Sequence, residues 1–195
     1  MYTFMIEFAA VVLFLGSAWH AARYEGRWFA QQWFVAAYVF GLLRETVMQV
    51  VFQMPLYASG IARLGAAPAV LSLLWGSLFY LAYVFARRFA PPDEEAPFAA
   101  LTFLIAASFA LPIEATAAQF EWWVYPGASL VLFGAMPVLA PLVWGGAAAL
   151  YWLFIHRINK SRLPDRGRVY AMITFAPIVA LLHVVYTLLL SAVLG

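Results

Sequence analysis

Apolar residues occur in six long runs that are separated by short polar segments. Each run has about 20 residues or more, which is the length that an α-helix needs to cross the hydrocarbon core of a membrane. The pattern therefore predicts six membrane-spanning helices, placed near residues 3–22, 28–53, 68–90, 98–119, 134–156 and 169–194.

The first run could also be a signal peptide, but it lacks a basic leading segment and contains Glu7. Both features favour a membrane helix. The predicted fold class is therefore an all-α polytopic membrane helical bundle of about six transmembrane helices. We expect it to form a single integral membrane domain over residues 1–195.

Composition supports a membrane protein, because 66% of the residues are hydrophobic, only 10% are charged and the mean hydropathy is +0.88. A soluble domain would carry about 25% charged residues. The chain has no cysteine, which excludes disulfides and thiolate metal sites.

The Lys and Arg residues follow the first, third and fifth predicted helices, whereas the opposite connections contain only Arg63. The positive-inside rule predicts that the basic connections are cytoplasmic and that both termini lie outside. We expect a bacterial or archaeal cytoplasmic membrane. The basic segment "RINKSRLPDRGR" at 157–168 could contact nucleic acid or lipid headgroups, but a topological signal is the favoured interpretation, and no nucleic-acid partner is expected.

Two segments of the chain indicate an internal duplication. "LGAAPAVLSLLWG" at 64–76 and "FGAMPVLAPLVWG" at 133–145 share Gly-Ala-x-Pro, six residues and then Trp-Gly. The same register aligns Glu45 with Glu114. We expect a parallel two-helix repeat, with units near 40–85 and 109–154, related by a pseudo-twofold axis along the membrane normal.

Glu45 and Glu114 fall at similar depths in their predicted helices, so the repeat would let them face each other. Ionisable residues inside a membrane are costly and usually functional. We predict that both are catalytic, the alternative being structural hydrogen bonding. The remaining residues predicted to bind substrate are Arg44, Gln49, Trp75, Trp122, Trp144 and His183.

Some of these residues have open alternatives. Arg44 points about 100° away from Glu45 around the helix, so it could reach a different carboxylate, extend to the interface or act as a structural anchor. His183 could be a hydrogen-bonded bundle histidine. Trp122 could belong to an interfacial aromatic belt.

The sequence has no phosphate-binding glycine loop, serine nucleophile elbow or HExxH motif, and its three histidines lie on different predicted helices. We therefore expect no metal and no cofactor. Two carboxyl groups in a dry cavity can act as general acid and base, and aromatic faces can stabilise a carbocation. These features predict protonation of a lipid carbon–carbon double bond, followed by water addition or proton loss.

The pieces that carry this chemistry are Glu45, "GAAPAVLSLLWG" at 65–76, "IEATAAQFEWWVYP" at 113–126 and "FGAMPVLAPLVWG" at 133–145. Their layout resembles membrane carotenoid-biosynthesis proteins of the hydratase type, which add water to the ends of acyclic or monocyclic carotenoids. "LPIE" at 111–114 is also similar to the Pro-x-Glu motif of the small membrane lycopene cyclases, which need no flavin.

Two positions depart from the hydratase pattern. The hydratases usually have Asp-Pro in the later acidic segment, where this chain has Glu114 and Ala115. Their Asn-Phe after Gly-x-Pro is replaced by Leu139 and Ala140. These departures leave open whether the substrate is a carotenoid or another isoprenoid, and whether catalysis is retained.

The resemblance implies a cofactor-independent enzyme with a lipophilic isoprenoid substrate. The alternative is a non-enzymatic membrane subunit, or a lipid- or pigment-binding protein, in a homo-oligomer or a larger membrane complex. A transporter is less favoured, because one short duplicated core leaves few gating elements. An enzyme would place both carboxyls around a cavity open to lipid, whereas a scaffold would fill that space with hydrogen bonds.

Overall fold

The computed structural model describes residues 3–125, 130–132 and 136–194. Within them lie six helices that are long and apolar enough to cross a membrane, which confirms the predicted all-α bundle. A π-helical segment, η1 (Met48–Phe52), continues the second helix. The six helices are α1 (Thr3–Tyr24), α2 (Arg27–Val47), α3 (Ala69–Ala86), α4 (Glu95–Gln119), α5 (Leu139–Asn159) and α6 (Asp165–Leu194).

Several helix ends differ from the predicted ones. The fifth helix begins at Leu139, because Met136 and Pro137 form a short strand before it. The sixth begins at Asp165, directly after Pro164. Proline disfavours helical backbone in the residue before it, and an acidic side chain is favourable in the first turn of a helix.

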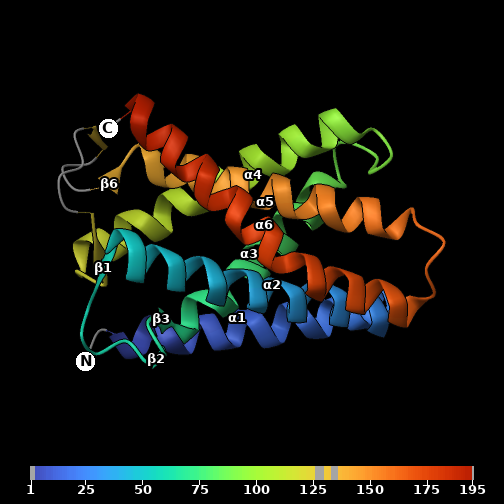
Figure 1. The fold of residues 1–195 in the computed structure, drawn as a ribbon, viewed down its shortest axis with the longest axis horizontal. Helices are drawn as coiled ribbons and strands as arrows, with labels where there is room; N and C mark the ends of the chain where they lie inside the picture. Colours follow the sequence, from blue (N-terminus) through green and yellow to red (C-terminus); the bar gives the residue numbers. More distant parts are fainter. Residues whose placement is uncertain (1–2, 126–129, 133–135, 195) are drawn as a thin grey trace.

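The strands are two residues each and gather at one end of the bundle, together with both termini (Figure 1). We call this the strand end. The opposite end holds the connections α1–α2, α3–α4 and α5–α6, and we call it the basic end because Arg87, Arg157 and Arg168 lie there. The strands are β1 (Leu56–Tyr57), β2 (Arg63–Leu64), β3 (Ala67–Pro68), β4 (Trp123–Val124), β5 (Val131–Leu132) and β6 (Met136–Pro137).

The two proposed repeat units have the same order of elements. In each unit a long helix is followed by an antiparallel strand pair, β2–β3 or β5–β6, that leads directly into the next helix. The strands β1 and β4 pair across the units, with Leu56 opposite Val124. Gly134 and Ala135 of the second sequence motif lie outside the described residues.

Helix α2 packs against α1, α3 and α6, and α4 packs against α3 and α5. Gly41 allows α2 and α3 to approach closely, since a Cβ atom at Gly41 would lie 2.8 Å from both Ser72 Cα and Trp75 Cδ1. This close approach brings Trp75 to the last turns of α2.

Replacing Gly41 by alanine is therefore expected to lower the free energy of unfolding by about 1–3 kcal/mol, because the added methyl group overfills the α2–α3 contact. Thermal unfolding in detergent, followed by tryptophan fluorescence, measures the effect. Gly16→Ala in α1 is the matched control, since a Cβ there meets nothing within 4 Å. Equal melting temperatures for Gly41→Ala and Gly16→Ala would contradict the prediction.

Candidate functional site

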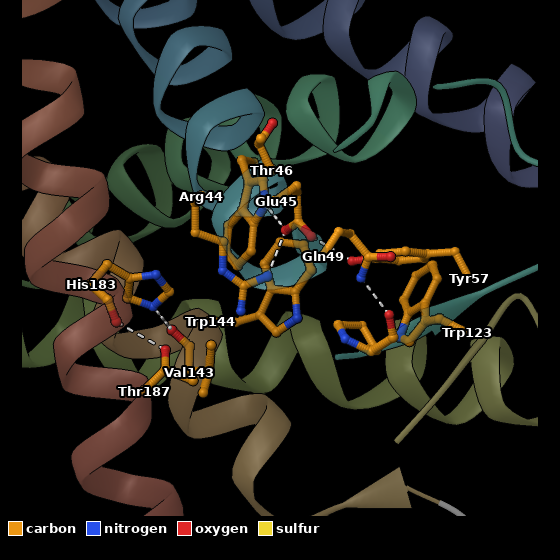
Figure 2. Close-up of polar contacts among 12 residues, drawn as sticks. Arg44, Glu45, Thr46, Gln49, Tyr57, Trp123, Val143, Trp144, His183 and Thr187 are labelled. Carbon is orange, nitrogen blue, oxygen red and sulfur yellow. Dashed lines mark hydrogen bonds and ion pairs between the residues drawn. The ribbon is translucent and has the colours of Figure 1, made fainter. Parts of the chain in front are cut away.

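Glu45 lies near the end of α2 with only 1% of its surface exposed, and its carboxylate accepts three hydrogen bonds (Figure 2). Arg44 Nη1 donates to Oε1 at 2.6 Å, and Trp75 Nε1 donates to the same oxygen at 2.9 Å. The hydroxyl of Tyr57 donates to Oε2 at 2.5 Å. Glu45 is therefore a buried carboxylate with one cationic and two neutral donors.

Glu114 lies in α4 with 2% of its surface exposed and also receives three donors. Trp144 Nε1 donates to Oε1 at 2.7 Å, and Trp123 Nε1 donates to Oε2 at 2.8 Å. The hydroxyl of Tyr125 lies 3.2 Å from each carboxyl oxygen. All three donors of Glu114 are neutral.

The two carboxyl groups are held in equivalent ways. Each accepts from a tryptophan that follows it by 30 residues, Trp75 for Glu45 and Trp144 for Glu114. The indole rings of these tryptophans stack on each other, with centroids 3.7 Å apart and planes inclined at 27°. The stacked pair therefore joins the two units at the level of the carboxyl groups.

The third donor differs between the two units. Arg44 occupies for Glu45 the role that Trp123 fills for Glu114, and the residue aligned with Arg44 is Ile113. The angle of about 100° between the two positions pointed Arg44 to a different carboxylate or to the interface. In the structure its long side chain bends back instead and pairs with the neighbouring Glu45. Its guanidinium also lies 5.3 Å from the centre of the Trp75 ring. The Arg44–Glu45 pair is thus neutral as a unit.

Tyr57 and Tyr125 lie outside the membrane-spanning helices, in the segments between them. Burial, reinforced by the nearby carboxyl groups, raises the pKa of both phenols well above the usual value of about 10. Both side chains therefore keep their protons at neutral pH and can donate hydrogen bonds.

Two cavities meet at this cluster. A small one of about 20 Å³ lies between the carboxyl groups, and it is large enough for about one water molecule. A second cavity of about 210 Å³ has a mostly apolar lining from α2, η1, α5 and α6. The residues that line both cavities are Arg44, Tyr125 and Val143.

The other residues predicted to bind substrate lie farther from these cavities. Gln49 Nε2 donates to the carbonyl oxygen of Pro55 at 2.5 Å. Trp122 is buried, stacks on Phe120 with ring centroids 5.6 Å apart, and accepts a hydrogen bond from the Ala58 N–H at its carbonyl oxygen. Gln49 and Trp122 are not among the described residues that line either cavity.

His183 lies on α6, on the opposite side of the Arg44–Glu45 pair from Tyr57 in Figure 2. Its Nε2 is 3.0 Å from the carbonyl oxygen of Val143, which can only accept, so Nε2 donates. The ring packs against Phe40 and Trp75, with centroid distances of 5.7 and 5.9 Å. The structure thus places His183 behind Trp75, where it supports the tryptophan.

Sequence reasoning did not select three of the donors, Tyr57, Trp123 and Tyr125. The two tyrosines correspond only when a one-residue gap is placed in the second unit, because Tyr57 follows Glu45 by 12 residues and Tyr125 follows Glu114 by 11. An ungapped comparison of the repeats therefore does not align them. Trp123 and Tyr125 belong to an aromatic run that is also typical of a membrane interface. A gapped comparison of the repeats would have revealed the tyrosine pair.

Comparison with known proteins gives no relative: no family model matches the chain, and no curated protein or solved structure matches it. Function has to be inferred from the chemistry of the site, because a fold alone does not determine it.

Proposed function

We propose that the protein is a cofactor-independent membrane enzyme that protonates a carbon–carbon double bond of an isoprenoid lipid. The sequence resemblance favours a carotenoid substrate, and the products would be hydrated, cyclised or isomerised. One observation carries this proposal: two buried carboxyl groups in different charge environments share a small cavity that borders a larger apolar one. An apolar cavity with a few convergent polar groups is typical of a ligand site.

The charge environments favour different roles for the two carboxyl groups. A buried carboxylate is costly unless a cation or strong donors compensate it. Glu45 has Arg44 and is suited to remain ionised. Among the described residues Glu114 has only neutral donors, so it is suited to carry the proton.

Tyr125 offers a route for that proton. Its hydroxyl is 3.2 Å from both oxygens of Glu114, longer than the usual 2.7–2.8 Å for an O–H···O bond, and Tyr125 lines both cavities. In the proposed step, Glu114 passes its proton to the Tyr125 oxygen while the phenolic proton moves to an alkene carbon. The products of the step are a Glu114 carboxylate, a neutral phenol and a carbocation.

The carbocation can then react in two ways. Water adds to it and returns one proton to a carboxylate, which gives the hydrated product. Alternatively, a second double bond attacks the cation and a proton is lost, which gives a ring. Because Arg44 and Glu45 are neutral together, the newly ionised Glu114 supplies the net negative charge that stabilises the cation.

Trp75 and Trp144 were predicted to bind substrate, but in the proposed enzyme they have a different role. Trp75 and Trp144 stack on each other, and Arg44 lies over the Trp75 ring. Their indole N–H groups hold the carboxyl groups. In the proposed enzyme these two tryptophans orient the acid and the base, and they do not stabilise the carbocation themselves.

A second candidate function is a lipid- or pigment-binding membrane protein. It is favoured by the hydrogen bonds on all four carboxyl oxygens and by the space for only about one water between them. In that role the apolar cavity would hold a lipid or pigment chain. The exposed apolar residues of α1 and α6 would contact lipid, a second copy or another membrane subunit.

A product analysis separates the two functions. Wild-type protein, Glu45→Gln and Glu114→Gln would be expressed at equal membrane levels in cells engineered to make lycopene and related acyclic carotenoids. Chromatography with mass spectrometry is expected to show a product heavier by one water, or cyclised and isomeric with the precursor, with wild type only. Unchanged pigments that co-purify with wild type would support the binding protein instead. Unchanged pigments without co-purification would exclude acyclic carotenoids both as substrates and as bound pigments.

A further inference from the structure

A second pocket lies at the basic end of the bundle, away from the carboxyl groups. Its volume is about 430 Å³, and it is formed where the α1–α2 turn, the end of α5 and the start of α6 meet. Its lining contains none of the residues that line the carboxylate cavity. Any ligand of this pocket therefore has no direct contact with the proposed chemistry.

The N-terminus of α2 opens into this pocket. Its N-cap is Gly26, which has no side chain to cap the helix, and the first intrahelical bond runs from Ala30 N–H to the Gly26 oxygen at 3.0 Å. The preceding N–H groups belong to Arg27, Trp28 and Phe29, and all three residues line the pocket. Such N–H groups and the positive end of the helix dipole attract anions.

Gln32, on the next turn of α2, gives independent support. Only 3% of its surface is exposed, it lines the pocket, and its Nε2 has no hydrogen-bond partner among the described residues. A buried amide without a partner is destabilising. A ligand that supplies an acceptor would remove this cost.

Arg168 brings a further unpartnered donor to the same pocket. Its Nε is buried without a partner in the described part of the chain. Its other nitrogens make only long contacts, Nη2 with the Ser161 oxygen at 3.4 Å and Nη1 with the Asp165 carboxylate at 3.8 Å. The guanidinium can thus still take a stronger acceptor.

Arginines outnumber acidic residues around the pocket. Its lining contains Arg27 and Arg168 with Glu25 and Asp165, and Arg87 and Arg166 contact lining residues from outside it. Arg27 and Arg166 both lie over the Trp28 ring, with their guanidinium carbons 5.0 and 5.6 Å from its centre. Of the two acidic residues in the lining, Glu25 forms an ion pair with Arg87, and Asp165 is exposed to solvent and makes only the long 3.8 Å contact with Arg168 among the described residues. Donors and guanidinium groups without matching acceptors indicate an anionic ligand with several oxygens.

We propose that this pocket binds the phosphate group of a membrane lipid. A phosphate supplies the several charged acceptors that an Arg guanidinium, an amide N–H and a helix N-terminus can share. The pocket lies at an end of six membrane-length helices, where lipid headgroups are found, and tryptophans such as Trp28 are typical of that level. A soluble phosphate compound would offer the same chemistry from a different source.

The test uses the full-length protein, purified in detergent and stripped of lipid. Native mass spectrometry would measure binding of phosphatidylglycerol, of diacylglycerol, which has no phosphate, and of inorganic phosphate. We expect wild type to bind phosphatidylglycerol in clear preference to the other two. Gln32→Leu and Arg168→Gln are each expected to weaken this binding about tenfold, through loss of one hydrogen bond to a charged group.

Arg162→Gln is the matched control for Arg168→Gln, because Arg162 is an exposed arginine in the connection just before α6, the helix that carries Arg168, and the change in charge is identical. Without lipid, Gln32→Leu should melt at or above the wild-type temperature, since it removes an unsatisfied amide. If Gln32→Leu then binds phosphatidylglycerol more weakly, the loss comes from the changed site and not from unfolding.

Three results would overturn the proposal. Equal phosphatidylglycerol affinity in wild type, Gln32→Leu and Arg168→Gln would exclude the pocket as the site. Equal losses of phosphatidylglycerol affinity in Arg162→Gln and Arg168→Gln would mean that surface charge alone, and not the pocket, accounts for the binding. Equal affinity for inorganic phosphate and for phosphatidylglycerol would assign the pocket to a soluble phosphate and exclude a lipid.

Discussion

Replacing Glu114 by glutamine is expected to lower the rate of product formation by about 10²–10⁴-fold, the usual contribution of a positioned general acid. Glutamine has nearly the same shape, but its amide cannot release a proton to Tyr125. One indole N–H, that of Trp123 or of Trp144, would then face the amide nitrogen, at a cost of about 1–3 kcal/mol in stability. The chemical effect should therefore exceed the structural one.

The measurement is the initial rate of product formation in isolated membranes that are supplied with an acyclic carotenoid. Glu94→Gln is the matched control, since Glu94 is an exposed carboxylate just before the first residue of α4, the helix that carries Glu114. We expect this control to keep the wild-type rate. A Glu114→Gln enzyme that keeps more than half of the wild-type rate, at equal protein levels, would exclude Glu114 as the acid.

The helices could be predicted from the sequence because a membrane imposes a length and an apolar composition on each span. The register of the two sequence motifs also indicated which residues would correspond. Glu45 and Glu114 are aligned by it, as are Trp75 and Trp144, and in the structure each tryptophan donates to its own glutamate. The repeat spacing was enough to predict these two glutamate–tryptophan correspondences, because both residues of each pair lie on helices.

The contact between Arg44 and Glu45 could not be predicted in this way. Helical periodicity gives the direction of each Cβ atom, whereas the long Arg44 side chain bends across the roughly 100° that separate neighbouring helical residues. Tyr57 was missed for another reason. Its position depends on the pairing of β1 with β4, two-residue strands that have no recognisable sequence period.

The two units are most informative where they differ. They share the tryptophan and tyrosine donors, so the duplicated frame alone would give two similar carboxyl groups. Arg44 breaks this equivalence, because the other unit has Ile113 at the aligned position and uses Trp123 as a donor. A single arginine thus creates the charge difference between the two carboxyl groups, and the proposed assignment of acid and base depends on it.

Removing that arginine is expected to have the largest effect on stability. Arg44→Met should lower the free energy of unfolding by about 3–5 kcal/mol, because it leaves the Glu45 carboxylate buried without its cation. Only 7% of the Arg44 side chain and 1% of the Glu45 side chain are exposed, so solvent cannot take the place of the missing partner. Denaturant unfolding in detergent micelles, followed by tryptophan fluorescence, measures the loss.

The double variant Arg44→Met/Glu45→Gln distinguishes a charge effect from a packing effect. It contains no buried unpaired charge, so it should recover most of the stability that Arg44→Met loses, as replacement of a whole buried ion pair often does. Arg162→Met, at an exposed position, should leave the unfolding curve unchanged. If Arg44→Met and the double variant lose equal stability, the loss comes from packing alone. Arg44 and Glu45 are then not energetically coupled, and the charge difference on which the acid and base assignment rests would have no support.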